Sequence, residues 1–217
     1  MIEKIIHFFA VGGVFMIPLV ISSVASVAFM LERGLALRRS LILPEPLLNA
    51  LARMRIGGST DEIEHHVAPG QTTLARLIRI GLEHLPWSKS ENMEAIQTQA
   101  RTEISRMERG LVVLEIVTGI GPLLGLLGTV SGLISVFAGI GSDKIASQGV
   151  LIAKGISEAL NCTVLGLVVA IPSLIAHSYF SKKIEAMSAE MESACMDFLT
   201  KLYLKSEAPS ATKPPEE

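Results

Sequence analysis

The sequence predicts an all-α membrane protein with three transmembrane helices and long helices that extend into the cytoplasm. Hydrophobic residues make up 49% of its 217 residues and charged residues only 18%. The mean hydropathy of +0.48 is high for a soluble domain of this length. Asp, Glu, Lys and Arg are absent from three segments, 5–31, 116–142 and 159–181. Because a helix needs about 20 apolar residues to cross a bilayer core, each segment is long enough to do so.

The first span is predicted at residues 5–31, after a short N-terminus at residues 1–4. A cleaved signal peptide is the alternative for this segment. Its apolar run is longer than the roughly 7–15 residues of a typical signal sequence. Glu32 and Arg33 follow the run, as they would at a cytoplasmic boundary. We therefore expect the segment to remain as a membrane helix.

The distribution of basic residues predicts the orientation in the membrane. Of the 19 Lys and Arg residues, 16 lie in residues 32–110 and 182–217. An odd number of spans places these two regions on the same side, and the positive-inside rule makes that side the cytoplasm. The N-terminus and a connection at residues 142–157 are then expected on the outer side of the membrane.

The cytoplasmic region at 32–110 is expected to be helical with several turns. The turns are marked by Pro and Gly residues: Pro44, Pro46, Gly57, Gly58, Pro69 and Gly70. Ser88 followed by Glu91 is the pattern of a helix capping box. Since no strong helix breaker follows, we predict one continuous helix from about Lys89 to Ile140, with the second span at residues 111–141.

Small residues form a stripe on each of the second and third spans. In the second span four glycines fall within about 60° of one another on a helix: Gly121, Gly125, Gly128 and Gly132. In the third span the stripe consists of Gly155, Ala159, Cys162, Gly166, Ala170 and Ser173. Helices in lipid associate through such close-packing faces, so we expect the two stripes to face each other. Pro122 and Pro172 are expected to bend the two spans.

The third span is predicted at residues 158–181, with its helix starting in the preceding connection. An apolar stripe at helical spacing predicts that the helix continues through residues 182–207. The stripe consists of Ile184, Met187, Met191, Ala194, Phe198 and Leu202. Residues 208–217 hold three prolines and few apolar residues, so we expect a disordered tail.

Two threonines are candidates for a polar path through the membrane. Thr129 lies 20 residues after Arg109, and Thr163 lies 19 residues before Lys182. In antiparallel helices the two hydroxyls therefore reach nearly the same depth. The alternative for each is a local hydrogen bond to the carbonyl four residues earlier in its own helix.

Glu158 is the third candidate, near the outer edge of the third span. Ionisable groups at membrane depth usually face protein or water, and Asn161 one turn away is a candidate hydrogen-bond partner. The alternative is a carboxylate exposed at the outer interface. Glu115, just inside the cytoplasmic boundary, is expected to be an interfacial group.

Other chemistry finds no support in the sequence. There is no Gly-rich phosphate-binding loop followed by Lys and Ser or Thr. No catalytic residues, cofactor or metal ligands are expected, and the adjacent His65 and His66 are interpreted as solvated loop residues. Ten acids are interleaved with the basic residues of 32–110, which argues against a nucleic-acid surface.

The two small-residue segments together resemble the ExbB/TolQ branch of the MotA/TolQ/ExbB proton channel superfamily. The sequence that begins at Gly121, GPLLGLLGTVSG, resembles its second span, and the sequence from Gly155, GISEALNCTVLGL, resembles its third. The resemblance is close over residues 106–181. Before these it extends mainly to the layout of one span and a helical cytoplasmic region.

This resemblance implies a fold, a partner and a function. Five copies surround a pore that holds the membrane helices of an ExbD/TolR-like partner, whose aspartate carries the proton. The assembly drives work at the outer membrane through a TonB- or TolA-like protein. Thr129 and Thr163 match the pore threonines of the family's second and third spans. Glu158 matches a family glutamate that lies five residues before the threonine of the third span.

The chain also departs from the family pattern. Asn161 and Cys162 stand where small or apolar residues are usual, which implies a more polar pore wall. Ser131 replaces a frequent tryptophan. Two other functions remain open at this point. One is a flagellar or gliding-type stator, although the flagellar branch usually has four spans. The other is a non-conducting membrane scaffold, for which the glycine stripes would serve oligomerisation alone.

Overall fold

The computed structural model describes residues 14–56, 59–67, 72–139 and 145–204, and all its elements are α-helices. Three of the helices are long and apolar enough to cross a membrane, within Met16–Ala36, Leu111–Ala138 and Gly155–Tyr203. The all-α class with three candidate spans is therefore confirmed. The start of the first span, the Gly57–Gly58 and Pro69–Gly70 turns, and the proline-rich tail lie outside the described residues.

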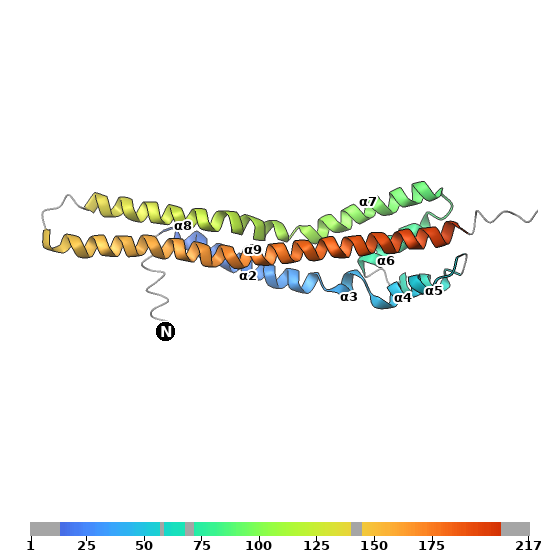
Figure 1. Cartoon of the computed structure of the whole chain (residues 1–217). Coiled ribbons are helices and arrows are strands. Elements are labelled where there is room, and N and C mark those ends of the chain that lie inside the picture. Colours follow the sequence, from blue (N-terminus) through green and yellow to red (C-terminus); the bar gives the residue numbers. More distant parts are fainter. Residues whose placement is uncertain (1–13, 57–58, 68–71, 140–144, 205–217) are drawn as a thin grey trace, which may run out of the picture. The chain divides into compact units, whose positions relative to one another are not determined.

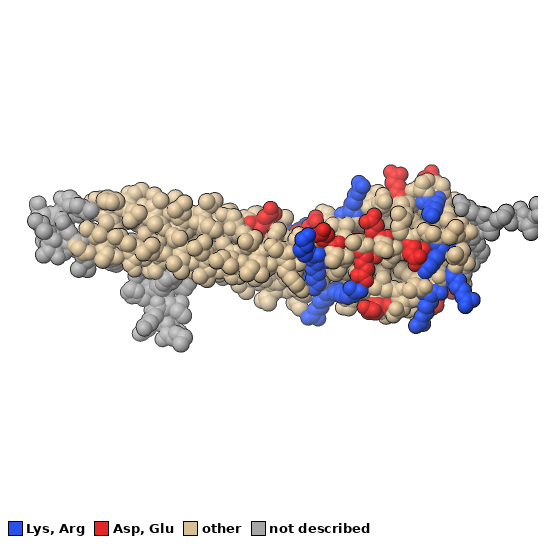
Figure 2. All heavy atoms as spheres, in the orientation of Figure 1, with Lys and Arg blue, Asp and Glu red and all other residues tan. Residues whose placement is uncertain are grey.

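The chain forms two compact units. The membrane unit takes residues up to 34 together with 109–181, and the polar unit takes residues 35–108 and those from 182 onward. Helix α9, Ile145–Tyr203, contributes to both, and its 59 residues run without a break (Figure 1). Figure 2 shows Lys, Arg, Asp and Glu gathered over the polar unit, whereas the visible face of the membrane unit carries very few of them.

The membrane unit contains α2 (Met16–Ala36), α8 (Leu111–Gly139) and the first part of α9. Helices α8 and α9 run side by side (Figure 1). Met16 and Leu19 of α2 pack with Cys162 of α9 in one buried cluster, which Leu124 of α8 also joins. The three helices thus share one core.

The polar unit contains five short or medium helices and the last part of α9. They are α3 (Arg39–Ile42), α4 (Glu45–Arg53), α5 (Asp61–Val67), α6 (Thr73–Glu83) and α7 (Lys89–Glu108). Its core consists of large apolar side chains, including Leu47, Ile63, Leu74, Leu77, Ile78, Met191, Phe198 and Leu199. Four positions of the apolar stripe expected on α9 are buried: Ile184, Met187, Met191 and Phe198.

Three local predictions meet different outcomes in this unit. The capping box is confirmed, because the Ser88 amide donates to Glu91 Oε2 at 3.0 Å and the Glu91 amide donates to Ser88 Oγ at 3.3 Å. Pro46, in contrast, does not break a helix but lies in the first turn of α4. This position tolerates proline because its amide has no partner in a helix. His65 and His66 lie on α5 rather than in a loop.

The prediction of one continuous helix from Lys89 to Ile140 was wrong. The chain breaks at Arg109–Gly110, between α7 and α8, and Ile140 lies outside the described residues. Gly110 is buried against the side chain of Arg33 from α2, and a Cβ atom there would lie 2.7 Å from Arg33 Cδ. A single glycine costs a helix only about 1 kcal/mol, so its sequence signal is weak. The contact with α2 is long-range and does not appear in local periodicity.

A buried carboxylate joins α6 to α7. Glu103 is 2% exposed and accepts from Arg76 Nη2 at 2.6 Å and Arg76 Nε at 3.0 Å. Gln99 and Arg106 also donate to it, at 3.0 and 3.1 Å. Burial would raise the pKa of Glu103, but Arg76 first and Arg106 second outweigh burial and hold the pKa below its usual value. The carboxylate is therefore ionised and fully paired inside the unit.

Candidate ion pathway between helices α8 and α9

The glycine stripe of α8 lies along the small-residue stripe of α9. Gly121 is next to Gly166 and Ala170, and Gly132 is next to Ala159 and Gly155. Between them, Gly125 meets the backbone of Cys162 and Thr163, and Gly128 meets the Cys162 side chain. The residue numbers rise on one helix as they fall on the other, so the two helices pack antiparallel along the whole stripe.

The approach of the two backbones is close enough to require glycine at several of these positions. A Cβ atom on Gly166 would lie 2.6 Å from the carbonyl oxygen of Gly121. A Cβ atom on Gly125 would lie 3.0 Å from Thr163 Cα. Neither contact can be relieved by rotating a side chain, since both neighbours are backbone atoms. In contrast, Gly119 on the same helix has nothing within 4 Å of its Cβ position.

The close approach brings the two threonine hydroxyls together. Thr129 Oγ1 of α8 and Thr163 Oγ1 of α9 are within hydrogen-bonding distance. Each hydroxyl also reaches a carbonyl oxygen of the other helix: Thr129 reaches Ala159 at 3.1 Å, and Thr163 reaches Gly125 at 3.2 Å. These carbonyls lie four residues before Thr163 and Thr129, so the two contacts are reciprocal.

The local alternative for Thr129 is present as well, because its hydroxyl lies 3.1 Å from the carbonyl of Gly125. A hydroxyl has one proton to donate and two lone pairs to accept with. The two hydroxyls therefore cannot donate in all of these contacts at once. If Thr129 donates to Thr163, then Thr163 donates to Gly125; if Thr163 donates to Thr129, then Thr129 donates to Gly125 or Ala159. The pair is an uncharged network with more than one proton arrangement.

Cys162 lies on the small-residue stripe of α9 opposite Gly128, as expected, but it is not exposed to a pore. It is 1% exposed and packs against Met16 and Leu19 of α2 and against Gly128. The expectation that it makes a pore wall more polar was therefore wrong, because its side chain belongs to the apolar core of the three helices. Asn161, one position earlier, is half-buried on α9.

The remaining predicted positions are placed as follows. Glu158 lies within α9, but its side chain is outside the described residues. Glu115 is exposed in the second turn of α8. Pro122 and Pro172 lie inside the continuous helices α8 and α9. A bend at either proline stays a prediction.

The structure adds one interhelical contact that the sequence analysis missed. Ser26 of α2 and Ser173 of α9 share a buried hydrogen bond of 2.6 Å, and Ser173 Oγ also donates toward the Val169 carbonyl at 2.7 Å. Ser173 stands on the predicted stripe, and Ser26 stands in a run rich in serine and alanine. A small polar residue in each of two apolar helices is the signal that could have paired them.

These observations define a class of protein before any comparison: a multi-pass α-helical membrane protein with a glycine-packed helix pair and an intramembrane threonine pair. Residues 70–193 match the MotA/TolQ/ExbB proton channel family. The chain belongs to this family, whose members are transport proteins and not enzymes.

Individual relatives support the assignment. The ExbB-like 1 biopolymer transport protein of Synechocystis sp. is 34% identical over 179 residues, covering 79% of this chain and 68% of the relative. The biopolymer transport protein ExbB of Pseudomonas putida is 29% identical over 194 residues, covering 85% of this chain and 57% of the relative. The Tol-Pal system protein TolQ of Haemophilus influenzae is 32% identical over 111 residues, covering 51% of this chain and 48% of the relative. The chain thus spans 48 to 68% of the length of these three relatives.

Proposed function

We propose that this protein is the channel subunit of an inner-membrane motor that couples the proton-motive force to work at the outer membrane. The work would be TonB-dependent uptake or the action of a Tol-Pal system. The observation that carries the proposal is the Thr129–Thr163 pair, held between antiparallel helices by glycines on both sides. Family membership and the names of the relatives support the same reading.

The chemistry of the pair suits proton passage. Uncharged hydroxyls can solvate a proton or pass it on without binding it permanently, and conduction requires release as well as binding. One elementary charge that crosses 100 mV releases about 2.3 kcal/mol, to which a pH gradient adds. This free energy is sufficient to bias a movement of rigid helices against each other.

A partner is needed to complete such a pathway. The acids in the sequences of the second and third spans are Glu115, in the second turn of α8, and Glu158, near the outer edge of the third span, so neither span has a centrally placed acid. We infer that a single-span protein of the ExbD/TolR type supplies an aspartate at this level. Five copies of the present chain would surround that partner, and a TonB- or TolA-like protein would transmit the movement.

The exposed faces of the spans support assembly with other helices and with lipid. Large apolar residues of α8 are exposed in the single chain, among them Leu123, Leu126, Leu127, Val130 and Phe137. The orientation that we propose has the N-terminus and the α8–α9 connection in the periplasm, and the polar unit in the cytoplasm. It rests on the concentration of Lys and Arg in the polar unit.

The experiment is a valine substitution of each threonine, Thr129→Val and Thr163→Val, in the chain expressed with its single-span partner. Valine keeps the shape of threonine but removes the hydroxyl. We expect each variant to assemble and to lose gradient-dependent work, measured as siderophore-limited growth or as resistance to detergent. Thr118→Val is the matched control, since its hydroxyl only donates to the Leu114 carbonyl of its own helix at 2.8 Å.

The same variants separate the motor from a non-conducting scaffold. A scaffold needs only the glycine contacts, so full activity of both valine variants would exclude the threonine pathway. Loss of activity together with loss of assembly would also count against it, because the threonines would then be packing residues. A neighbouring reading frame that encodes one transmembrane span with a single aspartate would favour the motor, and its absence would favour the scaffold.

A further inference from the structure

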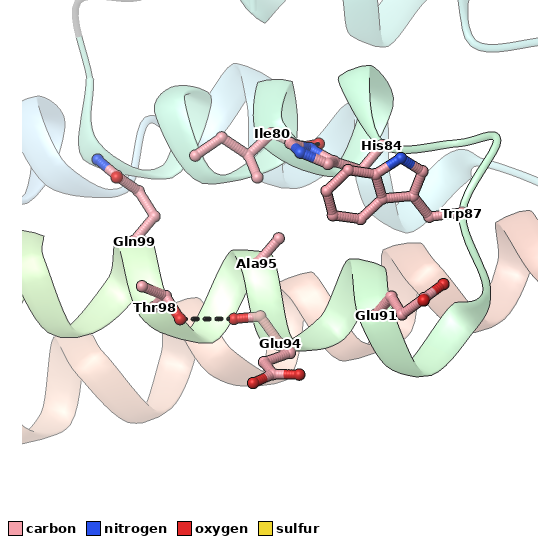
Figure 3. A pocket seen from close by; sticks show the side chains of 8 residues that line it. All are labelled: Ile80, His84, Trp87, Glu91, Glu94, Ala95, Thr98 and Gln99. Atoms are coloured by element: carbon pink, nitrogen blue, oxygen red, sulfur yellow. Dashed lines mark hydrogen bonds between the residues drawn. The ribbon is translucent and has the colours of Figure 1, made fainter.

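The polar unit has an open groove that the proposed function does not use. It lies between the end of α6 and the first half of α7 and has a volume of about 360 Å³ (Figure 3). Its lining consists of Ile80, His84, Trp87, Glu91, Glu94, Ala95, Thr98 and Gln99. We call it the His84–Trp87 groove, after its two aromatic residues.

The aromatic side of the groove is fixed in place. The rings of His84 and Trp87 meet edge to face with centroids 4.1 Å apart. His84 Nδ1 lies 2.8 Å from the Ile80 carbonyl and donates to it, and Tyr203 of α9 donates to the Trp87 carbonyl at 2.9 Å. The indole nevertheless stays 50% exposed, although tryptophan is a side chain that folding usually covers. This wall is a preformed apolar surface that the described part of the chain leaves uncovered.

The opposite side of the groove is acidic. Glu91 and Glu94 of α7 are among its lining residues, and no Lys or Arg is. In Figure 3 the Glu91 carboxylate lies on the side of Trp87, whereas the Glu94 carboxylate points away from the two aromatic rings. Glu91 Oε2 accepts from the Ser88 amide and hydroxyl, and these bonds hold the pKa of Glu91 below its usual value. The Glu94 carboxylate has no hydrogen bond or ion pair with the described part of the chain. The Glu91 carboxylate is therefore charged at neutral pH. Both carboxylates have oxygen atoms that can accept hydrogen bonds from a ligand.

We propose that the His84–Trp87 groove is a docking site for a cationic peptide segment of a partner protein. Its aliphatic side chains would lie on Ile80 and the Trp87 ring, and its Lys or Arg would pair with Glu91 and Glu94. An arginine beside the indole face adds a cation–π contact. Charge complementarity selects this occupant, since nucleic acid or an anionic lipid headgroup would meet two carboxylates and no cation.

The chain's own end is a poorer match for this groove. Residues 205–217 contain three glutamates against two lysines. A tail with an excess of acid would be repelled by Glu91 and Glu94 at the short distances that docking requires. A partner segment with the opposite charge balance fits better.

Trp87 is the only tryptophan in the chain, so its fluorescence reports on the groove directly. The probe is a short blocked peptide in which arginines alternate with leucines, titrated into the full-length protein in uncharged detergent. We expect saturable binding that shifts the Trp87 emission and weakens as salt is raised. A peptide with its arginines replaced by glutamine, and another with its leucines replaced by serine, should each bind at least about tenfold more weakly.

The decisive variant is the double substitution Glu91→Gln with Glu94→Gln. Glutamine at position 91 can still complete the capping box, so α7 should stay folded. We expect binding of the arginine–leucine peptide to weaken about tenfold. The matched control is Glu62→Gln with Glu192→Gln, which removes the same charge from exposed positions outside the groove and should leave binding unchanged.

Three results would overturn the proposal. One is equal binding by the groove variant and the control variant. Another is binding detected by calorimetry without any change in Trp87 emission, which would place the peptide elsewhere. The third is much tighter binding after residues 206–217 are deleted, which would make the chain's own tail the occupant. Thr129→Val should leave peptide binding unchanged, so this test stands apart from that of the ion pathway.

Discussion

Helix α9 packs by two different rules along its length. In the membrane unit its contacts with α8 are made by Gly155, Ala159 and Gly166, with backbones in direct contact. In the polar unit it presents Met191, Phe198 and Leu199, all essentially buried. Lipid is as apolar as leucine, so large side chains gain little by leaving it, and close backbone approach becomes the source of association. In water the burial of large apolar area is the dominant favourable term.

Each half of α9 holds one buried cysteine, so the stability of the membrane unit and that of the polar unit can be measured separately by cysteine labelling. Cys162 is 1% exposed in the membrane unit, and Cys195 is 2% exposed in the polar unit. Burial, together with the nearby Glu192 carboxylate, raises the pKa of Cys195 to about 12. At pH 8 only about one such thiol in 10,000 is ionised and reactive. Labelling by a membrane-permeable maleimide, read by mass spectrometry, therefore reports opening of each unit separately.

The largest effect is expected from the ion pair of the polar unit. Arg76→Met removes the bidentate partner of Glu103 and leaves a buried carboxylate with only Arg106 and Gln99. Breaking a buried pair from one side costs about 3–5 kcal/mol, and the remaining donors favour the lower end. We expect fast labelling of Cys195 and slow labelling of Cys162, with a lowered midpoint of unfolding in detergent.

Arg79→Met is the control for this change. Arg79 lies on the same helix and pairs with Glu83 at 3.1 Å, but both side chains are more than half exposed. Exposed pairs contribute about 0–1 kcal/mol, so Cys195 should stay protected. If both variants lose the same stability, the buried pair is not what holds α6 to α7.

The second-largest loss of stability is expected in the membrane unit, when one methyl group is added to a glycine of the stripe. Gly166→Ala places a Cβ atom against the Gly121 carbonyl oxygen and the Gly125 backbone, at 2.6 and 3.2 Å. Overpacking of this kind costs about 1–3 kcal/mol. We expect Cys162 to become reactive while Cys195 stays protected, the reverse of the pattern for Arg76→Met.

Gly119→Ala provides the matched control on α8, because its added methyl group meets nothing within 4 Å. Both alanines gain about the same helix propensity, so the difference between the variants isolates the interhelical contact. Equal protection of Cys162 in the two variants would mean that the α8–α9 approach tolerates a methyl group, and close packing would lose its role.

The two units also differ in how far the sequence could predict them. In the membrane unit, helical phase and distance from the basic ends were enough to pair the stripes and to bring Thr129 level with Thr163. Membrane helices are long and regular, so the number of residues between two positions gives their distance along the helix axis. The contact of Cys162 with Met16 and Leu19 of α2 was not predictable in this way, because helical phase on α9 does not reveal which side α2 covers.

In the polar unit the sequence predicted a helical region broken by turns and the Ser88 capping box, but not which helices pack together. Glu103 lies on the buried face of α7, seven residues after Ile96 and four before Met107. Only the fold brings its partner Arg76 of α6 to it, 27 residues away. The same holds for one contact of the membrane unit, because Gly110 lies against Arg33, which is distant in sequence. Contacts between residues that are far apart in the sequence leave no local sequence pattern from which they could be predicted.

The smallest effect is expected at the serine contact between α2 and α9. Ser26→Ala removes a buried hydrogen bond to Ser173, but Ser173 keeps its 2.7 Å bond to the Val169 carbonyl and is not left unpaired. Interhelical hydrogen bonds in membranes average about 0.6 kcal/mol, so we expect a loss of this size in the free energy of unfolding. Ser22→Ala is the control, because the Ser22 hydroxyl bonds the Pro18 carbonyl of its own helix at 2.8 Å. That bond also persists when the helices separate, and its removal should leave the stability unchanged. A loss at Ser26 larger than the loss at Gly166 would show that polar contacts, rather than close packing, hold the membrane unit together.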